Sequence, residues 1–139
     1  MDATFFTAQR PAAMSVSAWD DIPDEPAAEA LRIPDPGALT ALGKLLCGEG
    51  KTLVAPLRDA TCRSFPVWSF DPALSRRIAE LDDTEIDGLA ERWQRDPGCA
   101  GMEGDLYELS TLLADLREAL RQRPDSEEEL FVLLEQKAL

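Results

Sequence analysis

The sequence predicts a mainly α-helical fold, a compact bundle of five or six helices. Three observations favour it. Apolar residues after position 70 recur at helical spacing. Asp-Pro pairs and capping boxes, which are typical helix starts, precede these apolar stripes. The connections between the stripes are short, which makes successive helices antiparallel neighbours. The length of 139 residues is typical of one domain with its own hydrophobic core.

The first part of the chain lacks helical periodicity and is rich in proline. We expect residues 1–24 to form an irregular arm, with a short extended piece at 4–7, and residues 25–139 to form a single helical domain. Phe5, Phe6 and Trp19 make the arm too apolar for a disordered tail. The arm is therefore expected to lie across the domain.

Two helices are expected next. The first runs from Asp24 to Arg32 and ends because the following residue precedes a proline. The second starts at Asp35-Pro36 and is stopped by Gly48 or Gly50. Its buried stripe consists of four leucines: Leu39, Leu42, Leu45 and Leu46.

Residues 51–70 fit two interpretations equally. Alternating apolar positions predict two short strands, a β-ribbon around 52–70 with a turn at 58–61, whereas the aromatic and proline content also suits an extended loop. Pro56 and Pro66 each remove a backbone donor. Any strand here is therefore expected to be an edge strand or part of a two-stranded ribbon.

After residue 70 the pattern predicts four helices. They are expected to start at Asp71-Pro72, to span Asp82–Arg95 and Gly104–Gln122, and to start again at the capping box Ser126-x-x-Glu129. Trp68 and Phe70 should cover one end of this bundle. We expect its centre to hold four side chains: Trp93, Leu113, Leu116 and Phe131.

Composition excludes several classes of function. The chain has 27 acidic and 14 basic residues, no histidine and a net charge of −13. Nucleic acid and anionic membranes are therefore not expected as partners, and no catalytic triad or zinc site that uses histidine can form. The N-terminal residues lack the pattern of a signal peptide, and no apolar run reaches membrane-spanning length. We expect a cytoplasmic protein with reduced thiols at Cys47, Cys62 and Cys99, and a Cys47–Cys62 disulfide is the alternative.

Two short segments have the residue types of known binding motifs but not their complete pattern. Gly48-Glu49-Gly50-Lys51-Thr52 resembles the end of a phosphate-binding loop, but Leu45 stands where the first glycine belongs. Residues 83–88 begin like a calcium loop, but position 12 is Gln94 and a helical stripe runs through them. We therefore predict no cofactor, no metal site and no catalytic residue, and the chain is not expected to be an enzyme.

The acid excess is concentrated after residue 70. An acid in the first turn stabilises a helix by about 0.3–1 kcal/mol, because its charge complements the helix dipole. This structural role explains roughly half of the acidic residues in this part of the chain. The remaining excess fits two interpretations equally: solvated helix faces that keep the protein soluble, or an acidic surface that binds a protein partner with a basic surface. The candidate partner-binding residues are Glu80, Asp83, Asp87, Glu91, Glu103 and Glu108.

One stretch of the sequence is similar to small bacterial proteins. It comprises Phe65-Pro66-Val67-Trp68-x-Phe70-Asp71-Pro72-x-Leu74, the Leu81-Asp82 boundary and Leu89-Ala90-x-x-Trp93. In its small size, acidity and lack of a catalytic motif, the chain resembles the immunity proteins of bacterial toxin systems. That resemblance implies a non-catalytic protein that neutralises a toxin in the cytoplasm. A secretion chaperone or adaptor, a nucleic-acid mimic and a small enzyme are the alternatives, and a homo-oligomer is compatible with each.

Overall fold

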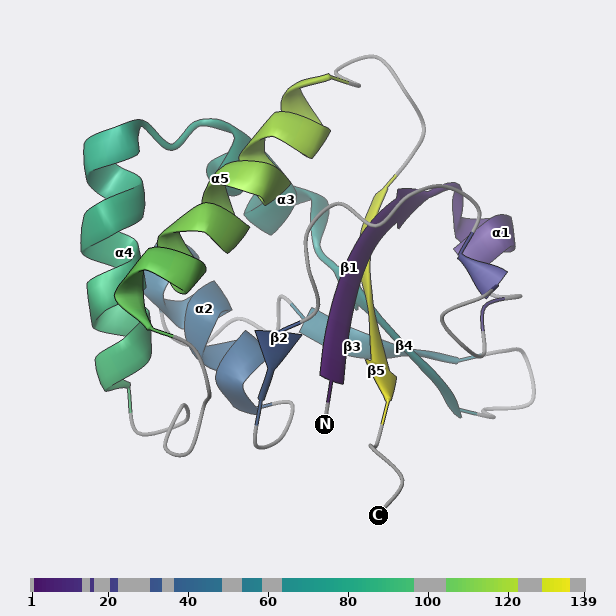
Figure 1. The fold of residues 1–139 in the computed structure, drawn as a ribbon. Helices are drawn as coiled ribbons and strands as arrows, with labels where there is room; N and C mark the ends of the chain where they lie inside the picture. Colours follow the sequence, from purple (N-terminus) through teal and green to yellow (C-terminus); the bar gives the residue numbers. More distant parts are fainter. Residues whose placement is uncertain are drawn as a thin grey trace.

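The computed structural model describes residues 2–13, 16, 21–22, 31–33, 37–48, 54–58, 64–96, 105–122 and 129–135. In these residues, a layer of helices packs on one face of a five-stranded sheet (Figure 1). The prediction of a mainly α-helical bundle is therefore wrong, because the fold is mixed α and β.

The sheet is antiparallel throughout, and its strand order is β2-β1-β5-β4-β3. The strands are β1 (Asp2–Ala8), β2 (Leu31–Arg32), β3 (Val54–Arg58), β4 (Ser64–Phe70) and β5 (Glu129–Glu135). The central strand is β5, the last in the chain. It pairs with β1 along its whole length, from Asp2 opposite Glu135 to Ala8 opposite Glu129. On its other side it pairs with β4.

The structure corrects the sequence interpretation at β5, where a final helix was expected. Its five consecutive apolar residues, from Leu130 to Leu134, are all buried because both faces of the strand are covered. Such a run shows no alternation, so its periodicity does not distinguish a buried strand from a helix. Glu129, expected in the first turn of that helix, begins the strand, and Ser126 lies outside the described residues.

Two further corrections concern the N-terminal part. Residues 2–8, expected as an irregular arm, form β1, and the extended piece foreseen at 4–7 lies within that strand. The end of the helix expected at 24–32 forms β2 instead, and residues 24–30 lie outside the described residues. Both strands pair only with distant parts of the chain, so the local pattern gave little indication of them.

For residues 52–70, the β-ribbon interpretation is confirmed, because β3 and β4 pair as antiparallel neighbours. The ribbon is also joined to the rest of the sheet through β4 and β5. Pro56 lies in β3, at the edge of the sheet, as expected. The expectation of an edge strand or an isolated ribbon is wrong for β4, which is an interior strand of the sheet. Pro66 lies in β4 just outside the β4–β5 pairs, which begin at Val67. At this position, the missing backbone donor does not interrupt the β4–β5 ladder.

The helices between residues 37 and 122 are confirmed, with small shifts at their ends. They are α2 (Gly37–Cys47), α3 (Pro72–Ala79), α4 (Asp83–Arg95) and α5 (Leu106–Arg121). Gly48 ends α2 in a left-handed conformation, with φ of 88°. The predicted capping box of α4 is present: Glu85 N–H donates to Asp82 Oδ1 at 2.7 Å, and Asp82 N–H donates to Glu85 Oε1 at 3.3 Å.

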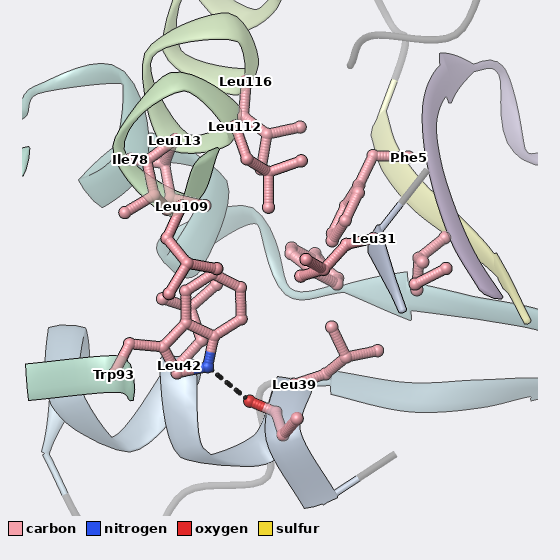
Figure 2. Close-up of a cluster of buried hydrophobic side chains, with 14 of the residues drawn as sticks. Phe5, Leu31, Leu39, Leu42, Ile78, Trp93, Leu109, Leu112, Leu113 and Leu116 are labelled. Carbon is pink, nitrogen blue, oxygen red and sulfur yellow. Dashed lines mark hydrogen bonds between the residues drawn. The ribbon is translucent and has the colours of Figure 1, made fainter. Parts of the chain in front are cut away.

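Each face of the sheet has its own hydrophobic core. The main core lies under α2–α5 and includes Phe5, Phe70 and Trp93 (Figure 2). The second core includes Phe6 and Phe131 and is covered by the short helix α1 (Arg10–Ala13), Val16 and Ile22. Phe5 and Phe6 belong to different cores because successive side chains of a strand point to opposite faces.

The expectation that four residues share one core is therefore only partly right. Trp93, Leu113 and Leu116 share the main core, and Phe70 lies in the same core with Trp68 packed against it. Phe131 was wrongly placed there. It lies on the opposite face of the sheet and stacks on Phe6, with ring centroids 5.7 Å apart.

Candidate interaction surface

The orientation of α4 determines which acidic side chains reach the surface. This helix lies at the outer end of the helical layer, where it packs against α5 and α2 (Figure 1). Its buried side chains are those of Ile86, Leu89, Ala90 and Trp93. Trp93 Nε1–H donates to the Ala38 carbonyl oxygen of α2 at 2.8 Å, in a buried environment (Figure 2). This contact fixes the rotation of α4 and leaves Asp83 and Asp87 exposed.

Several acids near the start of α4 have intramolecular partners. Asp83 Oδ1 lies 2.9 Å from a guanidinium nitrogen of Arg117, although the Asp83 side chain is 91% exposed. Glu85 forms the capping box and also lies 3.3 Å from Arg77. These carboxylates stabilise the junction of α3, α4 and α5, so their presence does not require an external partner.

The sign of the surface charge changes along α4. Glu91 forms an ion pair with Arg95 at 2.7 Å, and Arg92 and Arg95 are exposed in the last turn. This distribution of acids at the start and bases at the end complements the helix dipole. The acidic part of α4 is therefore restricted to its first turns, and Glu91 lies where the charge becomes mixed.

Two of the candidate residues are exposed at this acidic end and have no side-chain ion pair among the described residues. They are Glu80, which follows α3, and Asp87, in the second turn of α4. We define the acidic junction as Glu80, Asp83 and Asp87. It is the part of the predicted surface that the structure brings together, because these residues occupy the α3–α4 connection and the start of α4.

The other two candidate residues do not belong to the acidic junction. Glu108 is exposed in the first turn of α5. Arg117, nine residues later on α5, contacts Asp83, so Glu108 lies roughly 14 Å further along the helix axis. Glu103 lies outside the described residues.

Two arginines of α5 bind the end of α3 and the residues after it, an interaction that the sequence did not predict. A guanidinium nitrogen of Arg117 donates to the Leu81 carbonyl oxygen at 3.1 Å, and Arg121 Nε–H donates to the Ala79 carbonyl oxygen at 2.8 Å. Arg121 also donates to Leu81 at 3.1 Å. The last carbonyls of a helix lack partners within that helix. Arg121 satisfies such a group at Ala79, the last residue of α3, and both arginines bind the Leu81 carbonyl oxygen in the α3–α4 connection. The sequence carries no signal for these tertiary contacts beyond the shared helical face of the two arginines.

We expect Arg117→Ala to reduce the free energy of unfolding by about 1.5–3 kcal/mol, the usual contribution of hydrogen bonds to a charged group. The Arg117 side chain is only 11% exposed. Asp83→Ala should cost at most about 1 kcal/mol, because exposed ion pairs contribute little. Urea denaturation of both variants measures these losses. A larger loss for Asp83→Ala than for Arg117→Ala would contradict this assignment.

The described residues contain no group of three or more histidine, cysteine, aspartate or glutamate residues that could hold a metal ion. Residues 83–88, which resemble a calcium loop in sequence, are helical within α4 and cannot wrap around an ion. Cys47 is a free, half-buried thiol, whereas Cys62, Cys99 and residues 49–53 lie outside the described part.

Within the described parts of the chain, none of the helices is long and apolar enough to span a bilayer. Compared with protein-family models, curated proteins and solved structures, the chain gives no match. The acidic junction and the arginines that contact it can therefore be interpreted only from their own positions and contacts.

Proposed function

We propose that the chain is a non-catalytic acidic protein that binds a basic surface of another protein through the acidic junction. The observation that supports this most directly is the exposure of Glu80 and Asp87 without a side-chain ion pair among the described residues. Acids that cap helices or pair with arginine have a structural explanation, whereas these two do not. The net charge of −13 adds a long-range field that accelerates encounter with a basic partner.

The specific form we favour is a cytoplasmic immunity or antitoxin protein. Toxins that act on nucleic acids or nucleotides need basic clefts for their substrates, and an acidic protein can cover such a cleft. A rigidly held acidic surface is well suited to covering such a cleft. Asp87 lies on a helix whose rotation is fixed by the buried Trp93 and by the bond of its indole to Ala38. A preorganised surface loses less entropy on binding.

The test uses Asp87→Lys as the main variant and Asp115→Lys as its matched control. Both aspartates are exposed on helices, and both substitutions change the net charge from −13 to −11, since one acid is lost and one base gained. Asp115 lies two residues from Arg117 on α5, which turns it to the other side of that helix from the acidic junction. Glu91 is not used, because its reversal would break the ion pair with Arg95.

We expect Asp87→Lys to fold normally and to associate with the partner at least about threefold more slowly, with a weaker dependence on salt. Adding Glu80→Lys should enlarge the effect, because it removes a second unpaired carboxylate. Asp115→Lys should behave as the wild type. The partner is retrieved from source cells with the wild-type chain, purified and measured by stopped-flow association at several salt concentrations.

The identity of the retrieved protein provides the second part of the test. A protein with a basic surface that arrests growth when expressed alone, and not when co-expressed with this chain, supports the toxin-neutralising form. Equal association rates for Asp87→Lys and the wild type would contradict the role of the acidic junction. A secretion substrate among the retrieved proteins would support the chaperone alternative instead.

A further inference from the structure

We draw no further inference here: the strongest candidate, the surface patch formed by the exposed side chains of Leu106 and Tyr107 in the first turn of α5, carries no proposal because nothing in the structure shows what covers it.

Discussion

Replacement of Trp93 by alanine is expected to reduce the free energy of unfolding by about 3–5 kcal/mol, which is enough to unfold many domains of this size. The Trp93 side chain is fully buried and is the largest residue of the main core. It lies near Leu42 of α2 and Leu109 of α5 (Figure 2), so its removal leaves a cavity where three helices meet. Urea denaturation followed by circular dichroism measures the loss.

Trp93→Phe is the matched control for this substitution. It keeps an aromatic ring in the core but removes the hydrogen bond from Nε1 to the Ala38 carbonyl oxygen. We expect a smaller loss of about 1–2 kcal/mol, since a net hydrogen bond contributes roughly 0.5–1.5 kcal/mol and part of the ring volume is also lost. If Trp93→Ala were no more destabilising than Trp93→Phe, the main core would have to lie elsewhere.

Val132→Pro is expected to abolish folding. Val132 is fully buried at the middle of β5, opposite Phe5 of β1 and Trp68 of β4. Because strands pair with β5 on both sides at this position, the Val132 N–H meets a neighbouring strand whichever way it points. Proline removes that donor and costs about 3 kcal/mol or more in addition to the lost side-chain packing. Loss of chemical-shift dispersion in an NMR spectrum would show the unfolding.

Val132→Ala separates the effect of the backbone from that of the side chain. It keeps the N–H group and removes only two methyl groups from the core, for which we expect a loss of about 1.5–3 kcal/mol. The chain tolerates Pro56 in β3, where the outer edge of the sheet needs no ladder bond. A folded Val132→Pro variant with a stability like that of Val132→Ala would contradict the central position of β5.

The helices could be predicted from the sequence because their signals are local. Asp82 and Glu85 are three residues apart, and the stripe that ends at Trp93 repeats at helical spacing, so the start, face and extent of α4 follow from neighbouring residues. The strands depend on distant partners instead. Nothing near Phe5 or Phe131 in the sequence shows that the two ends of the chain pair with each other.

For the candidate surface too, features set by neighbouring residues could be predicted from the sequence, whereas contacts between distant elements could not. The sequence correctly indicated that Asp83 and Asp87 would be exposed on α4, because the buried stripe fixes the opposite side of the helix. It did not reveal that Arg117 pairs with Asp83, since that contact requires α5 to fold back along α4.

The position of β5 has a consequence for how the chain is made. Proteins are synthesised from the N-terminus, so the ribosome produces β1 first and the strand that completes the sheet last. Until Glu129–Glu135 emerges, β1 and β4 have no central strand between them, and the apolar residues around Phe5 and Phe6 stay without their main partner. Pairing of Asp2 with Glu135 closes nearly the whole chain into one loop, which slows folding. During this interval, the uncovered apolar surface makes the nascent chain prone to aggregation.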